Sequence, residues 1–129
     1  MKYKILVVDD EPDIVILLAK FLEKAGYEVE SAANGREAFD KIKSWAPDLV
    51  ISDVQMPVWD GFKLLKNLQD LPQSTPTPVL IVSGYVGGSE MELTHSRHFA
   101  GFIAKPFNIR RMIEVVDSFF KERSSVAPV

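Results

Sequence analysis

The sequence predicts an α/β protein: a doubly wound, five-stranded parallel sheet with helices on both faces. Short apolar runs alternate with longer segments whose apolar residues recur at helical spacing, which is typical of repeated strand–helix units. Several of the apolar runs also lead directly into polar residues. A length of 129 residues, with 47% apolar and 26% charged residues, suits one globular domain.

The first half of the chain supplies two strand–helix units. Residues 3–8 form the first expected strand, and Pro12 begins a helix because proline is tolerated in the first turn. A second strand over residues 27–32 is followed by a turn at 34–35. The next helix must end before Pro47.

The second half supplies three more strands, at residues 49–53, 79–82 and 102–104. A helix follows the first of them. The stretch 84–98 is the least regular part and could hold a short helix. The last helix follows Asn108, which suits an N-cap.

These elements predict one domain over residues 1–122, with a flexible tail or linker stub at 123–129. We adopt the strand order 2-1-3-4-5 of flavodoxin-like folds by analogy. In such a sheet the carboxyl ends of all strands meet at one edge, where open α/β sheets bind their ligands.

The residues expected at this edge suggest phosphoryl chemistry. Asp9 and Asp10 follow the first strand, and Asp53 closes the third. Ser83 closes the fourth strand, and Lys105 follows the fifth. Neighbouring carboxylates repel one another, and Mg²⁺, which prefers carboxylate, carbonyl and water oxygens, would relieve the repulsion. With a lysine and a hydroxyl nearby, Asp53 could attack phosphorus and form an acyl phosphate.

Composition excludes several other classes. The net charge of −3 gives no reason to expect direct nucleic-acid binding, and the absence of cysteine excludes disulfides and thiol chemistry. No apolar stretch is long enough to span a membrane, and no signal peptide precedes the first strand. We therefore expect no membrane association and a cytoplasmic location.

The chain resembles response-regulator receiver domains along residues 1 to about 122. Four motifs carry the resemblance: VVDDE at 7–11, DVQMPVWDG at 53–61, SG at 83–84 and KPF at 105–107. Each motif alone is modest, but together, in this order and spacing, they are highly specific. The similarity is to single, chemotaxis-regulator-like receivers of two-component systems.

The resemblance implies that Asp53 accepts a phosphoryl group from a histidine kinase or a histidine phosphotransfer domain. It implies a Mg²⁺ ion, for which Mn²⁺ can substitute, bound by Asp10, Asp53 and the backbone carbonyl of Gln55. Asp9 would act through a metal-bound water. The chain would then catalyse only its own phosphorylation and dephosphorylation, and would otherwise not be an enzyme.

The resemblance also implies how the signal is read out. Ser83 and Lys105 would each hydrogen-bond a phosphoryl oxygen, and Phe102 would be a rotameric switch. The Lys105–Pro106 bond is expected to be cis. The changing surface would comprise the helix expected within 84–98, the fifth strand and the last helix. It would act on an unknown downstream protein or a fused output domain, from a monomer or a weak phosphorylation-dependent dimer.

Some positions depart from the family pattern. His98 stands where receivers commonly have glycine, which predicts an altered end to the preceding helix. Ala100 and Gly101 lack the acidic residues of the winged-helix class, which argues against its charged dimer. His95 and His98 are expected to be surface histidines rather than a metal pair. Trp59 could serve either packing or contact with a partner.

Two alternative functions remain open. A phosphatase of the haloacid-dehalogenase type also forms an aspartyl phosphate, but it needs a second aspartate two residues after the nucleophile, where this chain has Gln55. A receiver fold acting only as a binding module would not need the polar residues at the strand ends, and all five are present.

Overall fold

The computed structural model describes residues 2–71, 76–84 and 96–125, and the elements below lie within them. The strands are β1 (Lys4–Val8), β2 (Glu28–Ala32), β3 (Leu49–Asp53), β4 (Val79–Ser83) and β5 (Phe99–Ala104). The helices are α1 (Pro12–Lys24), α2 (Gly35–Trp45), α3 (Gly61–Gln69) and α4 (Ile109–Ser125).

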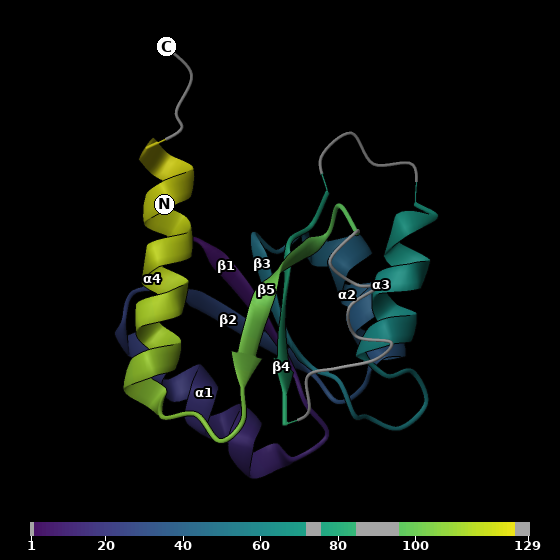
Figure 1. The fold of residues 1–129 in the computed structure, drawn as a ribbon, viewed down its shortest axis with the longest axis horizontal. Helices are drawn as coiled ribbons and strands as arrows, with labels where there is room; N and C mark the ends of the chain where they lie inside the picture. Colours follow the sequence, from purple (N-terminus) through teal and green to yellow (C-terminus); the bar gives the residue numbers. More distant parts are fainter. Residues whose placement is uncertain (1, 72–75, 85–95, 126–129) are drawn as a thin grey trace.

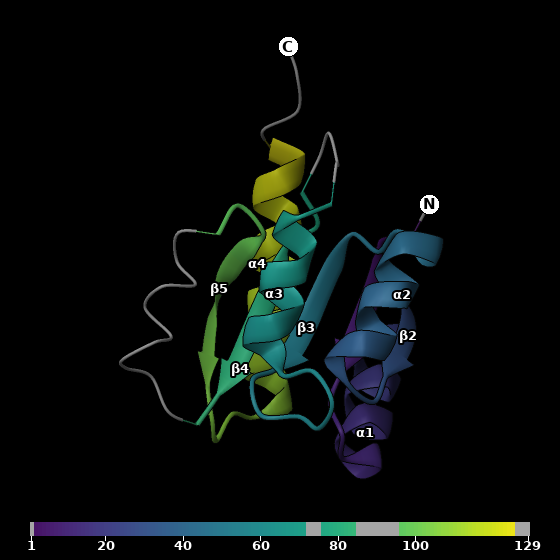
Figure 2. The same cartoon turned by 90° about the vertical axis from the view of Figure 1, so that its right-hand side faces the viewer.

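The strands form one parallel sheet with the order β2-β1-β3-β4-β5, which confirms the predicted order. Helices α1 and α4 cover one face, and α2 and α3 cover the other (Figure 1). Seen from the side, the arrowheads of the strands lie at the same end of the molecule (Figure 2). This end carries the predicted site.

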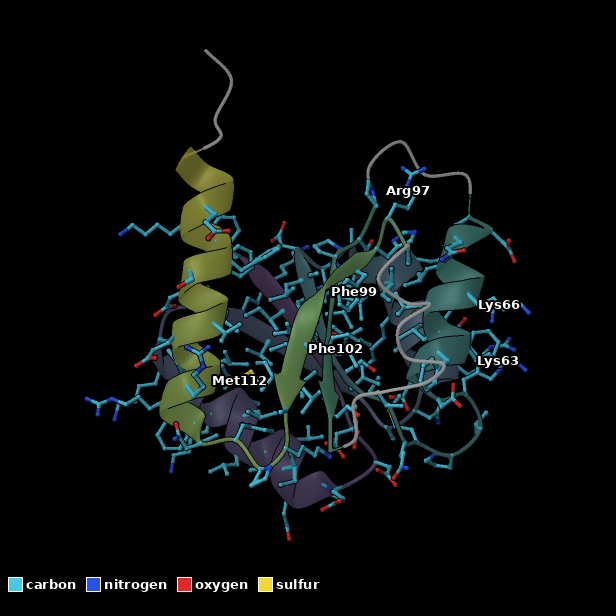
Figure 3. The ribbon with its side chains drawn as sticks, in the orientation of Figure 1. Lys63, Lys66, Arg97, Phe99, Phe102 and Met112 are labelled. Carbon is cyan, nitrogen blue, oxygen red and sulfur yellow. The ribbon has the colours of Figure 1, made fainter. Side chains whose placement is uncertain are left out.

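A separate apolar layer lies on each face of the sheet. Side chains of α1 and α4 form the first layer with the strands: Leu18, Leu22, Met112, Val116 and Phe120. Figure 3 shows Met112 on α4, beside β5. Side chains of α2 and α3 form the second: Ala38, Ile42, Leu64, Leu65 and Leu68. Because both faces are covered, the strands β3 and β4 are buried along their whole length, which explains their continuous apolar sequences.

Several boundaries differ from the expectation. Asn34 is not in a free turn but caps α2, since its side chain accepts a hydrogen bond from the Glu37 N–H at 2.9 Å. Strand β5 begins at Phe99 rather than at residue 102, because its first residues also pair with β4, across an irregularity in the register. Helix α4 runs to Ser125, past the expected domain end. Most of the expected short helix falls outside the described residues.

The expectation of a surface histidine at His98 is wrong. Its side chain is 2% exposed, and Nδ1 lies 3.0 Å from the Thr77 carbonyl oxygen. His98 is buried because its backbone is bonded to the sheet: the His98 carbonyl accepts from the Val79 N–H at the start of β4. His95 lies outside the described residues.

Tyr27, just before β2, is tied to α4. Its hydroxyl donates to the Asp117 carboxylate, and its ring lies 5.3 Å from that of Phe120. Burial, and then the hydrogen bond and charge of Asp117, raise the pKa of Tyr27 well above its usual value.

We therefore expect Tyr27→Phe to lower the free energy of unfolding by about 1.5 kcal/mol, the usual contribution of a hydrogen bond to a charged group. Urea denaturation measures this change. The control is the same change in an Asp117→Ala background, where the acceptor is absent and the effect of Tyr27→Phe should be smaller. Equal midpoints for Tyr27→Phe and the parent protein would contradict the prediction.

Candidate functional site

Three carboxylates converge at the carboxyl edge of the sheet. Asp53 ends β3, and Asp9 and Asp10 directly follow β1, the neighbouring strand. One carboxylate oxygen from each lies within 4.8 Å of the others. Asp9 and Asp53 are buried, whereas Asp10 is exposed. The predicted acidic cluster is therefore present, with one side open to solvent.

Local hydrogen bonds hold two of these carboxylates. Oδ1 of Asp9 accepts from the Glu11 N–H at 2.9 Å, at the start of α1. Oδ1 of Asp53 faces the Gln55 N–H at a longer distance of 3.4 Å. The loop after β3 therefore turns back over the carboxylate that closes the strand.

The electrostatics of the cluster favour a cation. Burial raises the pKa of Asp9, and the negative charges of Asp53 and Asp10 raise it further. The Glu11 N–H and the Lys105 ammonium act in the opposite direction without reversing the shift. The cluster offers carboxylate oxygens as metal ligands, and its Asp10 side is exposed to solvent. This suits a hard divalent ion that keeps part of its water shell, so these residues can bind a metal.

Lys105 reaches this cluster from the other side. Its ammonium donates to Oδ2 of Asp53 at 2.9 Å. Burial by itself would lower the pKa of Lys105, but the hydrogen bond and the charge of Asp53 raise it overall, so the side chain is a cation. The Lys105–Pro106 peptide bond is cis, in agreement with the expectation.

Ser83 and Gly84 stand beside Lys105 at the next strand end. Ser83 is buried, and its carbonyl accepts from the Lys105 N–H at 2.8 Å. A Cβ at Gly84 would lie 3.8 Å from Cβ of Lys105, at ordinary contact distance. The sheet thus places the serine next to the lysine in the way that the sequence predicted.

Phe102 lies on β5, where it packs against the apolar layer of α2 and α3 (Figure 3). Its ring centroid is 4.8 Å from that of Phe99. Residues three apart in a regular strand point to opposite faces. The register irregularity and the positive φ of Gly101 (141°) bring the two rings to the same face. This aromatic pair was not predicted from the sequence.

Glycine is required where the loop after β3 closes. The Gly61 N–H donates to the Val54 carbonyl at 2.9 Å, and a Cβ at Gly61 would lie 2.9 Å from the Asp53 carbonyl oxygen. Asp60 caps α3 by accepting from the Lys63 N–H at 2.9 Å. The sequence marked this dipeptide as a turn, but not the contact of Gly61 with the backbone of Asp53.

Val58, in the same loop, has a left-handed backbone with φ of 67°. Its side chain is 73% exposed, so it gains little from packing. The left-handed region costs an L-residue about 1–2 kcal/mol, and asparagine tolerates it best among the residues with a side chain.

We expect Val58→Asn to raise the free energy of unfolding by about 1 kcal/mol, because it relieves this strain at an exposed position. Chemical denaturation tests the prediction, with Val15→Asn as a helical position where the same change should destabilise. A lower midpoint for Val58→Asn than for the parent protein would contradict it.

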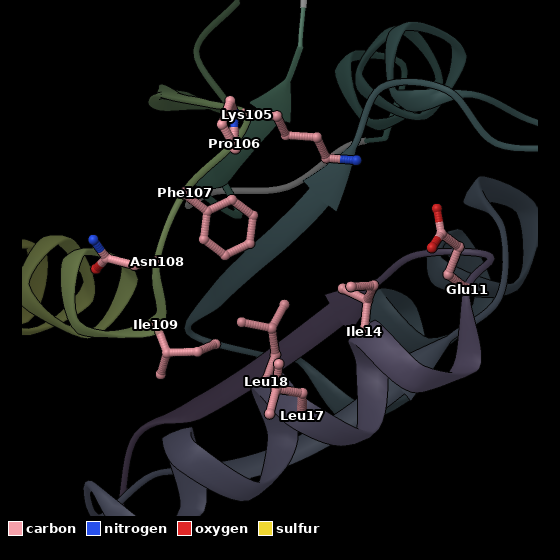
Figure 4. A pocket seen from close by; sticks show the side chains of 9 residues that line it. All are labelled: Glu11, Ile14, Leu17, Leu18, Lys105, Pro106, Phe107, Asn108 and Ile109. Atoms are coloured by element: carbon pink, nitrogen blue, oxygen red, sulfur yellow. The ribbon is translucent and has the colours of Figure 1, made fainter.

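An apolar groove opens next to Lys105. Figure 4 shows Ile14, Leu17 and Leu18 of α1 facing Phe107 and Ile109 across it, with Lys105 and Glu11 at one end; the cavity volume is about 520 Å³. Leu17 is 42% exposed. The groove was not predicted, because it forms only when α1 and the segment before α4 come together.

Comparison with known proteins identifies the class that this site defines. The profile of the response regulator receiver domain matches residues 5–117, and the chain belongs to this family. Response regulator GtcR of Aneurinibacillus migulanus is 39% identical over 108 residues, which cover 84% of this chain and 43% of GtcR. The chain thus spans less than half of that relative.

Other relatives match along their whole length. Sporulation initiation phosphotransferase F of Bacillus subtilis is 35% identical over 130 residues, covering 97% of this chain and 99% of the relative. The solved structure of a CheY-like receiver domain protein from Methanospirillum hungatei superposes with a TM-score of 0.87 at 28% identity, covering 98% of this chain and all of that one.

The family sets the biological context. Receiver domains serve two-component and phosphorelay signalling, where they pair with histidine kinases or phosphotransferases, and they are not conventional enzymes. Within the described residues, no helix combines the length and apolar character needed to cross a bilayer.

Proposed function

We propose that the chain is a phosphorylatable switch whose Asp53 accepts a phosphoryl group from a phosphohistidine of a kinase or phosphotransfer domain. The observation that carries the proposal is the placement of the Lys105 ammonium, 2.9 Å from an oxygen of Asp53, inside a cluster of three carboxylates. One lysine cannot balance three anions, which leaves a place for a divalent ion.

In the proposed reaction an oxygen of Asp53 attacks phosphorus in line with the histidine nitrogen. The P–N bond breaks, and its electron pair stays with the imidazole. Bound Mg²⁺ or Mn²⁺ would supply positive charge next to the phosphoryl oxygens. Asp10, Asp53 and the Gln55 carbonyl would hold the ion, with Asp9 bound to its water. Lys105 would move from Asp53 to a phosphoryl oxygen, and the Ser83 hydroxyl would donate to another.

The signal would leave through β5 and its surroundings. Movement of Ser83 toward the phosphoryl group would open space beside β5, into which Phe102 would turn. The changed surface would consist of residues 84–98, β5 and α4, and would contact a downstream protein or a fused output domain. Amide exchange over residues 84–107 should change with the phosphoryl mimic beryllofluoride; changes confined to the carboxylate loops would contradict this output.

The groove beside Lys105 suits the phosphodonor protein. The donor histidine must come to Asp53, and an apolar surface continuous with Lys105 provides contact area next to that path.

Such partners are expected in the cytoplasm, which is also the proposed location of this chain.

We expect Leu17→Asp to slow phosphotransfer from the protein donor by about tenfold or more, because it places a charge in an apolar contact. The rate with a small phosphodonor should stay unchanged, since that reagent needs no docking surface. Phosphotransfer measured with both donors separates these effects. Lys20→Asp, on the same helix, is the control. Equal slowing with both donors would exclude a docking role for the groove.

The function as a whole is tested by mass spectrometry after incubation with a small phosphodonor and Mg²⁺. A hydroxylamine-labile adduct on the peptide containing Asp53 supports the proposal. If neither a small donor nor a phosphorylated histidine domain modifies the protein, the proposal is refuted.

A further inference from the structure

Trp59 contacts the start of α2. It lies in the loop between β3 and α3, which also contains Gln55. The Trp59 carbonyl accepts from the Gly35 N–H at 2.9 Å. The indole lies 5.4 Å from the Phe39 ring, centroid to centroid, at an interplanar angle of 59°. The guanidinium of Arg36 lies 5.5 Å from the indole centroid. A loop residue is thus held by one backbone and two side-chain contacts to a single helix.

A fourth contact comes from α3. The Lys63 ammonium lies 5.6 Å from the indole centroid, and Figure 3 shows this lysine on the outward side of its helix. Cations at this distance from an indole are attracted by the negative face of the ring. Trp59 therefore joins α2 to α3 across the tip of the loop.

The residue opposite Trp59 must be glycine. A Cβ on Gly35 would lie 2.7 Å from the Trp59 carbonyl oxygen and 2.8 Å from its Cβ, closer than real contacts allow. The contact is also useful to α2, because the N–H groups of a first helical turn have no partner within the helix. Gly35 and Trp59 are therefore matched to each other.

The backbone beside Trp59 indicates that this attachment determines the path of the loop. Val58 keeps its left-handed φ of 67° although its exposed side chain gains little from that conformation. Strained backbone of this kind persists only where neighbouring contacts impose it. The nearest contacts on the carboxyl side of Val58 are those of Trp59.

We propose that Trp59 is a positioning residue that, through Gly35 and Phe39, holds the loop between β3 and α3 in the shape needed to bind the cation. The Gly61–Val54 hydrogen bond closes the base of the loop. Trp59 therefore needs to fix only the tip. The inference rests on the proposed function, in which the Gln55 carbonyl is a metal ligand. Groups that hydrogen-bond to a metal ligand and orient it commonly affect metal affinity by about 10–100-fold, and Trp59, which acts through the loop backbone, should lie at the lower end of that range.

The first test is Mg²⁺ titration by calorimetry, well below the unfolding temperature. Trp59→Ala should weaken Mg²⁺ binding by about tenfold, and Trp59→Phe, which keeps a ring against Phe39, should restore most of the affinity. Trp45→Ala is the matched control. Trp45 lies at the other end of α2 and contacts Lys4, so its loss should lower stability without changing Mg²⁺ affinity.

A second variant perturbs the contact without touching the tryptophan. Gly35→Ala should also weaken Mg²⁺ binding, because its methyl group pushes the Trp59 carbonyl away. Alanine is the better helix former, so a loss cannot come from helix propensity. Unchanged Mg²⁺ affinity in both Trp59→Ala and Gly35→Ala would overturn the proposal.

Amide exchange without metal measures directly how firmly the loop is held. Exchange of residues 54–60 should be faster in Trp59→Ala than in Trp45→Ala if Trp59 holds the loop. Equal exchange in the two variants would overturn the proposal. A parent protein that bound no Mg²⁺ would refute the metal site of the proposed function, while the exchange result would still decide whether Trp59 fixes the loop.

Discussion

Asp53→Asn should abolish phosphorylation by both a small phosphodonor and a histidine-phosphorylated protein. The carboxamide is a poor nucleophile toward phosphorus, and its substitution also removes the anion that binds the Lys105 ammonium at 2.9 Å. Because the proposed reaction forms its new bond at this one oxygen, the signal should fall to the background of the assay rather than by a partial factor.

Asp60→Asn is the matched control, since it makes the same chemical change in the same loop. Asp60 caps α3 through the Lys63 N–H, and asparagine caps a helix about as well as aspartate. Phosphorylation should therefore survive in Asp60→Asn. Intact-mass measurement with and without hydroxylamine compares the variants. An adduct of parental amount in Asp53→Asn would place the acceptor elsewhere.

Mg²⁺ should stabilise the parent protein, and Asp10→Asn should remove most of that effect. A ligand at a hundred times its dissociation constant stabilises the folded state by about 2.7 kcal/mol. Without metal, the three carboxylates lie within 4.8 Å of one another and repel. Burial is the main cause of the raised pKa of Asp9, and the charges of Asp53 and Asp10 raise it further. Asp10→Asn should consequently be more stable than the parent without Mg²⁺ and less stable than the parent with it.

This reversal of order is measured by thermal unfolding over a Mg²⁺ series. Asp13→Asn serves as the control, because Asp13 is an exposed residue in the first turn of α1 and is not a member of the cluster. Its response to Mg²⁺ should match that of the parent. A full Mg²⁺ shift in Asp10→Asn would show that the ion binds without this carboxylate.

The sequence by itself determined the class of fold and the chemistry of the site. Apolar runs such as 49–53 and 79–82 are long enough to cross a sheet covered on both faces, and their lengths placed Asp53 and Ser83 at the same edge. Parallel strand–helix units leave few arrangements of the sheet, so a local pattern predicted which polar residues meet. Asn108 was likewise recognised as a cap, and its side chain accepts from the Arg111 N–H.

The tertiary structure decided the features that depend on contacts between distant segments. The local sequence around a single histidine does not indicate whether it is buried. His98 is buried because its carbonyl accepts a hydrogen bond from the Val79 N–H at the start of β4. The Phe99–Phe102 pair exists because the register of β5 shifts against β4. Trp59 and Gly35 are far apart in the sequence, and no periodicity connects them. Their fit follows from the close approach of a loop to the first turn of a helix, which only the packed chain defines.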